Sequence, residues 1–442
     1  MTRKNAHCCL GFAALVTAGL LGCSGPDQPL APASPSASVG ATGPFQFTPI
    51  AASAACTDGG DPLQPIVLPP GYSQVIIASE PAFPDLIDMN TQNETGPEAG
   101  RFLYRTHETR TNGAVSVTDL ETGLTRVLAQ RADWEQLDGI VWTPSRTILF
   151  AEERTVALLP DPAVPQARAG LVYELDPVTG AAVPRPALGA KSHEGMRFGP
   201  RGDLYSISES NPGYLFRFVP DRHGDLSSGQ LYVLKVITPT GDRTGGAIWI
   251  ALDRTAVQVD ANAAATAAGA TGYNRPEDVE IATSTGNNHG GANVLYFAVT
   301  GAGDNRVLAV DLREPAGGSE HATAFVYDYV RIGLNAPADF ESPDNLALDH
   351  AGNLYVAEDP GTAPVTRRGD DVWVAMPGRP SDNQRAPASS VVRFASLTDC
   401  QAEPTGIYFE HTGDRLFFNV MHRGGDALDK AMAVLRPQST HE

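Results

Sequence analysis

A strand-rich cassette recurs six times along this chain, and it limits the fold more than any other feature. The copies begin at Phe83, Asp138, His193, Arg275, Ser342 and Glu403, with a mean spacing of 64 residues. Each copy has an alternating apolar stretch, a small turn, and a second alternating stretch. A fixed period of this length, combined with period-two alternation and Gly-containing turns, predicts a repeated all-β architecture.

Further alternating stretches lie between the copies and end in Asp, Pro, Gly or Asn turn residues. Examples are "GAVSVTDLETG" (113–123) and "GLVYELDPVTG" (170–180). Each unit therefore supplies four strands, and the chain is predicted to form a six-bladed β-propeller with four-stranded blades over residues 63–442. Residues 239–272 do not follow the pattern and are expected to form an elaborated loop. Within them, the Ala-rich run that begins at 257 lacks an apolar stripe.

The first residues read as a targeting segment. Arg3 and Lys4 precede a short apolar run that ends in "LLGC", and this sequence resembles a bacterial lipobox. The pattern predicts a signal peptide over residues 1–22 and diacylation of Cys23, whose two acyl chains would anchor the protein stably. Residues 23–62, rich in Pro, Ala and Ser, are expected to be a disordered tether. The expected location is the bacterial cell envelope, with membrane contact only through the anchor.

Export would place the fold in an oxidising compartment. Of the five cysteines, Cys8 and Cys9 would leave with the signal peptide and Cys23 would carry lipid. Cys56 and Cys400 remain, one before the first cassette and one in the last unit. Because a ring must be closed where its ends meet, these two are predicted to form a disulfide.

The formal net charge of −19 argues against nucleic acid as a partner, since phosphate backbones require basic surfaces. The same charge is compatible with cation binding. The expected partner is a small-molecule ester substrate, and the protein is expected to be a monomer.

The repeat places acidic residues at two equivalent positions. In a propeller, the entry to the innermost strand and the exit from the second strand lie on one face. Crowded carboxylates there would repel one another unless a cation neutralises them, and oxygen ligands select Ca²⁺, Mg²⁺ or Mn²⁺. Flanking histidines 107, 193 and 422 could admit a transition metal; alternatively, the acids cap strands. The candidate metal ligands are Glu108, Asp138, Glu152, Glu153, Glu194, Glu277, Asp344 and Glu403.

The boxes "SHEGMRFGP", "RPEDVEI", "SPDNLALD" and "EPTGIYFEHTGDRLFFNV" resemble the PhoX-type alkaline phosphatase family. The resemblance implies a six-bladed propeller that hydrolyses phosphomonoesters with Ca²⁺ and iron in an axial site. Carried over by position, it makes Glu108, Glu152 or Glu153, Glu194, Glu277, Asp344 and Glu403 the candidate metal ligands. Arg275 or Arg197 could pair with the phosphate, since a guanidinium matches two of its oxygens, and the catalytic candidates are Glu194, Glu277 and Arg275. The iron-binding Cys of the family falls on Asp138, and an oxygen ligand there favours Ca²⁺ over iron.

Two other interpretations remain open. One is a lactonase-like or other esterase propeller, in which a single Ca²⁺ polarises a carbonyl and Asn274 and Asn345 serve among the ligands. The other is a non-catalytic, lipid-anchored binding module whose metal is structural.

Overall fold

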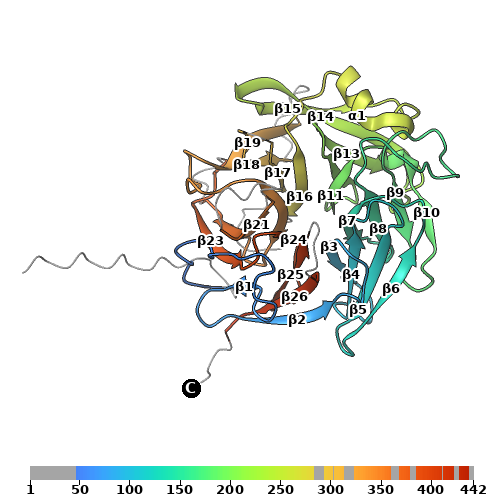
Figure 1. The fold of residues 1–442 in the computed structure, drawn as a ribbon. Coiled ribbons are helices and arrows are strands. Elements are labelled where there is room, and N and C mark those ends of the chain that lie inside the picture. Colours follow the sequence, from blue (N-terminus) through green and yellow to red (C-terminus); the bar gives the residue numbers. More distant parts are fainter. Residues whose placement is uncertain are drawn as a thin grey trace, which may run out of the picture. The chain divides into compact units, whose positions relative to one another are not determined.

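The alternating stretches form strands in the computed structural model, which describes residues 46–282, 293–301, 303–312, 323–359, 368–378, 385–410, 412–422 and 428–437 (Figure 1). One sheet contains β3 (Ile87–Gln92), β4 (Phe102–His107), β5 (Ala114–Asp119) and β6 (Leu124–Gln130). The next contains β7 (Leu137–Trp142), β8 (Ile148–Glu152), β9 (Val172–Leu175) and β10 (Ala182–Pro184).

The largest sheet has nine strands. In spatial order they are β11 (His193–Phe198), β12 (Leu204–Ser208), β13 (Leu215–Pro220), β14 (Gly229–Gly241), β15 (Thr244–Ala251), β19 (Ala324–Arg331), β18 (Arg306–Asp311), β17 (Val294–Val299) and β16 (Pro276–Ala282). It is this long because β15 pairs with β14 on one side and with β19 on the other.

Two sheets complete the ring. One contains β20 (Pro343–Leu348), β21 (Leu354–Glu358), β22 (Asp371–Met376), β23 (Ser390–Leu397) and the short β1 (Ile66–Val67). The last contains β24 (Ala402–Phe409), β25 (Arg415–His422), β26 (Lys430–Leu435) and β2 (Ser73–Ser79). All of these pairings are antiparallel.

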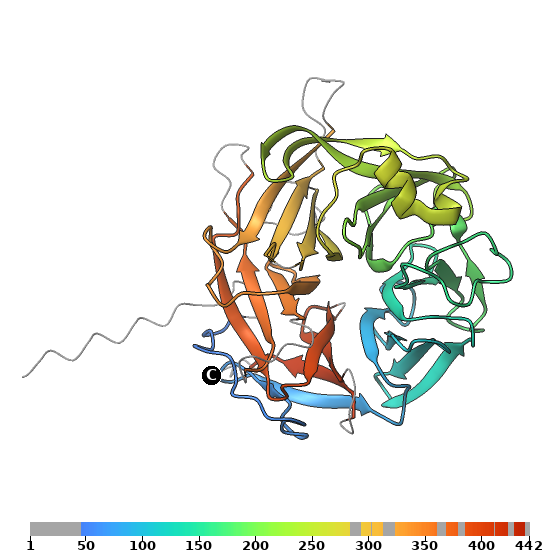
Figure 2. The same ribbon diagram turned by 45° about the horizontal axis from the view of Figure 1, so that its top comes forward.

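The strands β3, β7, β11, β16, β20 and β24 contact one another in turn, and β24 contacts β3 again. These inner strands therefore surround an axis, as Figure 2 shows, and the prediction of a β-propeller is confirmed. The prediction of six separate blades is not: the described residues form five sheets, because β15 joins two four-stranded units into one.

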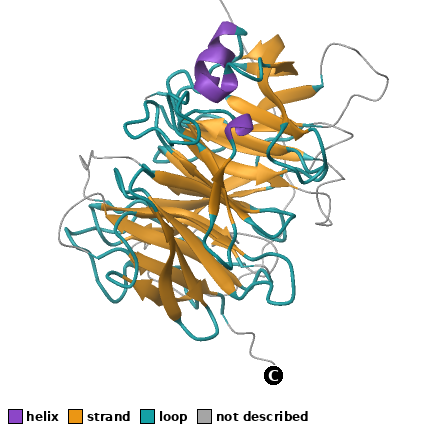
Figure 3. Ribbon diagram, turned by 90° about the vertical axis from the view of Figure 1, so that its right-hand side faces the viewer, coloured by secondary structure: helices purple, strands orange, loops and turns teal. Residues whose placement is uncertain are grey.

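The loop expected over residues 239–272 instead contains β15 and a helix, α1 (Val257–Ala267), which Figure 3 shows in purple. Val257, Ala261 and Ala265 of α1 are buried on one side of the helix. Alanine is small enough to pack closely without producing a visible apolar stripe in the sequence. A 3₁₀ helix, η1 (Pro186–Leu188), lies nearby. None of the described helices is long and apolar enough to cross a bilayer.

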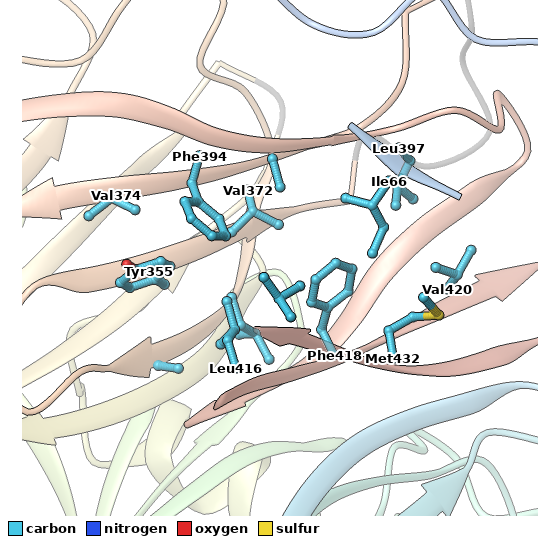
Figure 4. Packing of buried hydrophobic residues seen from close by; sticks show 14 of the residues in the cluster. Ile66, Tyr355, Val372, Val374, Phe394, Leu397, Leu416, Phe418, Val420 and Met432 are labelled. Atoms are coloured by element: carbon cyan, nitrogen blue, oxygen red, sulfur yellow. The ribbon is translucent and has the colours of Figure 1, made fainter. Parts of the chain in front are cut away.

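Apolar clusters fill the spaces between neighbouring sheets. Figure 4 shows one, in which Tyr355 and Phe394 from the β20–β23 sheet lie near Phe418 and Met432 from the last sheet. Five such clusters each contain 16 or 17 buried residues among those described. The seam between the last sheet and the β3–β6 sheet has only two small clusters, of four and three buried residues. Apolar packing is therefore weakest where the ring closes.

The two ends of the chain meet near this seam. The N-terminal strand β2 pairs with β26 and so completes the last sheet. Cys56 and Cys400 form the expected disulfide, with their Cα atoms 5.1 Å apart. Both the strand pairing and the covalent bond tie the beginning of the propeller to its end.

The tether prediction needs correction for its described part. Residues 46–62 pack against the fold: the ring of Phe47 lies 4.9 Å from that of Phe394, and the N–H of Ile50 donates to the carbonyl of Arg393. These contacts could not be predicted from a segment composed mainly of small residues. The signal peptide over residues 1–22, the lipidation site Cys23 and the tether up to residue 45 lie outside the described residues.

A buried histidine gives the ring closure a pH dependence. His422 lies between Asp399, 3.0 Å from its Nε2, and Asp429, 3.1 Å from its Nδ1. Burial alone would lower its pKa, but the hydrogen bonds to both carboxylates raise the pKa to about 9. Because this value lies above the ordinary pKa of 6.5, the stabilisation is complete below pH 6.5 and is lost as the pH rises through about 9.

We therefore expect thermal stability to fall between pH 7 and pH 10, and the fall to be smaller in His422→Asn. Each hydrogen bond of this charged type is worth about 1.5–3 kcal/mol. Differential scanning calorimetry of both proteins across this range measures the effect. If the unfolding temperatures of the parent and His422→Asn fall in parallel as the pH rises, the assignment to His422 is wrong, since all other titrating groups are common to both proteins.

Candidate metal centre

Six carboxylates occupy the same position on six inner strands. The second residue of each inner strand is acidic, and all six side chains line one cavity of about 220 Å³ at the axis. In order they are Asp88, Asp138, Glu194, Glu277, Asp344 and Glu403. In the first five strands the pairing register shifts directly after the strand's first residue. Such bulges redirect side chains, and here they coincide with the acids that face the axis.

Four more carboxylates come from the second strands. Glu108, Glu153, Glu209 and Asp359 directly follow the last residues of β4, β8, β12 and β21, and all four line the same cavity. The repeat therefore brings ten carboxylates to one small space.

Backbone hydrogen bonds connect the two groups of acids. The N–H of each second-strand acid donates to the carbonyl two residues before the inner-strand acid. The bonds are Glu108 to Leu86 at 2.8 Å, Glu153 to Gln136 at 2.8 Å, Glu209 to Ser192 at 3.1 Å and Asp359 to Ser342 at 2.9 Å. Leu86, Gln136 and Ser342 have positive φ angles of 56°, 44° and 42°. Strained backbone of this kind is characteristic of functional sites.

Neighbouring residues in the chain have different roles. The carboxylate of Glu152 accepts hydrogen bonds from the backbone N–H groups of Glu135 and Leu171, at 3.1 and 3.0 Å. It holds the blade together and lies outside the cavity, whereas Glu153 lines it. This corrects the placement of Glu152 in the ring. Glu358 and Asp359 differ in the same way. Glu358 accepts a hydrogen bond from the indole N–H of Trp373 at 2.6 Å and lies outside the cavity, whereas Asp359 lines it.

Glycines allow the inner strands to approach one another beside the acids. A Cβ atom at Gly195 would lie 1.6 Å from a carboxylate oxygen of Asp278, and one at Gly139 would lie 2.2 Å from the carbonyl oxygen of Glu194. Asp278 itself is fully buried and accepts from the N–H groups of Val279 and Leu346, at 2.7 and 3.0 Å. It therefore links two inner strands and does not line the cavity.

The carboxylates are close enough to disturb one another. Two groups, Asp138–Glu153–Glu194 and Glu194–Glu277–Asp344, each place oxygen atoms within 4.8 Å of one another and share Glu194. Burial, together with the neighbouring negative charges, raises the pKa values of Asp138, Glu153, Glu194 and Glu277 well above their ordinary range. Asp138 Oδ1 is buried with no hydrogen-bond partner among the described residues. Such a site suits bound cations.

One guanidinium lines the cavity alongside these acids. Arg275 has a positive φ of 49°, and its side chain is 44% exposed. It pairs with Glu209, and its Nη2 lies 3.4 Å from Oε1 of Glu277. Arg197, in contrast, is half-buried and pairs with Glu280 at 3.0 Å outside the cavity.

The histidines do not contribute to the cavity. His107 bonds to the hydroxyl of Ser116 at 2.9 Å, His193 to the carbonyl of Gly189 at 2.9 Å, and His422 to its two aspartates. Asn345 lines the cavity, but its amide oxygen accepts the N–H of Gly406. Asn274 is not among the lining residues. The ionised groups available to a metal are therefore carboxylates, which are hard oxygen donors.

The structure brings seven of the eight predicted ligands to this cavity: Glu108, Asp138, Glu153, Glu194, Glu277, Asp344 and Glu403. The sequence interpretation did not assign Asp88, Glu209 or Asp359 as ligands. A strict alignment of the six cassettes would have found them. Asp88 is the second residue of its inner strand, and Glu209 and Asp359 directly follow their second strands. Gln136 also lines the cavity, and its Nε2 donates to Glu108 at 3.0 Å.

With this geometry established, comparison with known proteins identifies the family. A family model described as alkaline phosphatase PhoX matches residues 161–424, more than half of the chain. The chain belongs to the PhoX alkaline phosphatase family. The matched segment contains the three catalytic candidates, Glu194, Arg275 and Glu277, and ends after Glu403. Family and fold together support a phosphatase-like hydrolase, and the acidic groups can bind metal.

One solved structure supports the fold. PhoX from Pseudomonas fluorescens, in complex with the transition-state analogue vanadate, superposes with a TM-score of 0.66 at 18% identity, covering 90% of this chain and 98% of that one. A virginiamycin B lyase from Staphylococcus aureus with quinupristin gives a TM-score of 0.41 at 12% identity, covering 82% and 99%, which is too low to support an argument. No curated protein matches the sequence.

Proposed function

We propose that this protein is a metal-dependent phosphomonoesterase of the cell envelope, with Ca²⁺ held by carboxylates at the propeller axis. The observation that carries the proposal is the cavity that collects ten carboxylates and one guanidinium. Membership of the PhoX family supports the reaction class. A phosphate ester requires both kinds of group, since cations and a guanidinium balance its negative charge.

The residues of the chain fit hard cations. Glu194 belongs to both three-carboxylate groups, so it is the residue best placed to hold more than one ion. Bound cations would supply Lewis-acid stabilisation of the phosphoryl oxygens. Asp138 contributes an oxygen donor where the family resemblance placed a thiolate, and this supports Ca²⁺ in preference to iron.

Arg275 is proposed to bind the phosphate. Its guanidinium carries paired N–H donors that match two phosphate oxygens. The ion pairs with Glu209 and Glu277 hold it at the cavity wall while nearly half of the side chain stays exposed to an incoming ligand. Glu277 would thus both hold a metal and position the arginine.

The cell-envelope location rests on the sequence of residues 1–23, which favours a lipoprotein with the anchor on Cys23. The charge of −19 supports a small-molecule substrate and opposes nucleic acid as a partner. We further propose that the protein acts as a monomer. Metabolic labelling with a radioactive fatty acid and sedimentation of the purified protein test the anchor and the oligomeric state.

Replacement of Glu194 by Gln tests the site directly. This substitution keeps the shape of the side chain and removes one charge shared by both groups, so we expect the bound calcium content to fall and turnover of a chromogenic phosphate monoester to drop by about 10²-fold or more. Elemental analysis of protein purified without chelator measures the metal, and a colorimetric assay measures turnover.

Glu152→Gln is the matched control, because it makes the same Glu-to-Gln change at a residue outside the cavity. It should lower stability and leave the metal content unchanged. If Glu194→Gln retains full metal and full activity, the site is wrongly assigned. If calcium is present but no phosphate ester is hydrolysed, the non-catalytic module becomes the better interpretation.

A further inference from the structure

A second cavity, of about 540 Å³, lies at the opposite ends of the first strands. It is lined by Asn93 after β3, Phe102 at the start of β4, Trp142 at the end of β7, and Val178 in the turn after β9. The acids of the axial site come from the start of β3 and β7 and the end of β4. The two cavities share no lining residue. A volume of this size is typical of small-molecule sites.

Three aromatic rings form one wall of this cavity. The ring of Tyr104 stacks on Trp142 with centroids 6.1 Å apart, and Phe102 lies 6.4 Å from Tyr104. Hydrogen bonding to the hydroxyl of Thr95, at 3.0 Å, fixes the indole of Trp142. On the other side, the side chain of Val178 is 86% exposed. The walls therefore suit an apolar or aromatic body.

Several polar groups that can donate hydrogen bonds line this cavity. Tyr104 is only 4% exposed, and its hydroxyl makes no hydrogen bond to any described residue, yet it belongs to the cavity lining. Arg126 and Arg146 also line the cavity, and neither forms an ion pair with a carboxylate in the part of the chain that the structure describes. Both arginines are exposed, so they are accessible to a ligand in the cavity. The carboxylate at the rim, Glu98, is already paired with Arg101 at 2.7 Å.

The backbone holds one of these arginines in place. Arg146 has a positive φ of 64° in the turn between β7 and β8, where its N–H donates to the carbonyl of Thr143 at 2.9 Å. Its side chain passes Gly96, where a Cβ atom would lie 3.5 Å from the Arg146 Cδ. The Arg146 side chain therefore lies beside Gly96, another residue of the cavity lining.

We propose that this cavity binds a small organic anion, a carboxylate or phosphate carried on an aromatic body. The anion would accept hydrogen bonds from Arg126, Arg146 and the Tyr104 hydroxyl, while its ring packs on Phe102 and Trp142. The two guanidinium groups favour an anionic ligand over a cationic one, and the Tyr104 hydroxyl can donate to it. The inference does not depend on the phosphatase function of the axial site.

Isothermal titration with phenylphosphonate and phenylacetate tests the proposal, since neither is a phosphate ester that the protein could consume. Inorganic phosphate and benzyl alcohol separate the contributions of charge and ring. We expect measurable binding of at least one aromatic anion, and at least tenfold weaker binding of both comparators. Charged hydrogen bonds of this kind are worth roughly tenfold or more each.

The double variant Arg126→Ala/Arg146→Ala should weaken binding by tenfold or more and leave ester turnover unchanged, while Arg222→Ala, an exposed arginine elsewhere, should bind like the parent. Tyr104→Phe should weaken binding several-fold without altering the fold. Binding that survives in the double variant but is lost in Glu194→Gln would assign the anion to the axial site and overturn the proposal. Equal affinity for benzyl alcohol, or no binding of either aromatic anion, would overturn it as well.

Discussion

Chelation is expected to abolish turnover of phosphate esters and to lower the unfolding temperature by about 5 °C, and added Ca²⁺ should restore both. A ligand at about a thousand times its dissociation constant stabilises the folded state by about 4 kcal/mol, and each kcal/mol shifts the midpoint by about 1 °C in a protein this large, since the unfolding entropy grows with chain length. Differential scanning fluorimetry, with a chromogenic assay on the same samples, measures the two effects. Chelator already saturated with Ca²⁺ is the control.

The stability effect should grow with pH. Burial and mutual repulsion raise the pKa values of Asp138, Glu194 and Glu277 in the metal-free fold. In the unfolded chain these groups ionise near pH 4, so their contribution to stability is intact below that value and is lost as the pH rises towards the raised pKa values. Metal-free protein should therefore be less stable at pH 8 than at pH 5, and Ca²⁺ should add more at pH 8.

Two outcomes would contradict this account. Full activity after exhaustive chelation would remove the metal mechanism altogether. A melting temperature that is the same with and without metal, at both pH values, would mean that the axial carboxylates do not hold an ion.

Loss of the Cys56–Cys400 disulfide should destabilise the protein by roughly 5 kcal/mol. The bond closes a loop with a sequence separation of 344 residues, and in the chain-entropy model a loop of this length constrains the unfolded state strongly. Cys400 lies in the connection from β23 to β24, where Thr57 and Asp399 form a β-bridge and the N–H of Cys400 donates to the carbonyl of Thr57 at 3.1 Å. Urea unfolding of the variant Cys56→Ser/Cys400→Ser, which leaves no free thiol at either position, measures the loss.

Reduction of the parent protein provides an independent comparison. Under a reductant, the urea midpoint of the parent protein should move to that of the double variant. The midpoint of the double variant itself should stay unchanged. A double variant as stable as the oxidised parent would show that β2–β26 pairing alone closes the ring.

Much of the site could be predicted because the acids obey the repeat. Glu194, Glu277 and Asp344 stand at the same place in three cassettes, and a propeller brings such positions to one axis. What the sequence could not separate was which of two adjacent acids faces the axis. Glu152 and Glu153 have the same chemistry, and only the register of β8 against β9 shows that the first bonds to the blade.

The errors in the fold have a physical cause in common. The segment before residue 62 and the helix α1 are rich in Ala and other small residues, which suggest a tether or a loop. Their packing depends on a few contacts that are distant in sequence, such as Phe47 with Phe394 and Ala261 with the carbonyl of Ala190 at 2.8 Å. Local composition carries no signal of such contacts.

The alternation of roles between neighbouring residues has a consequence for how such proteins diversify. Glu152 and Glu358 hydrogen-bond within their blades, while Glu153 and Asp359, one position further on, line the axial cavity. A substitution at the axial position changes the ligand set and leaves the architecture untouched. Descendants of one scaffold can therefore exchange a sulfur donor for an oxygen donor, or lose a ligand, in single steps without passing through an unfolded ancestor.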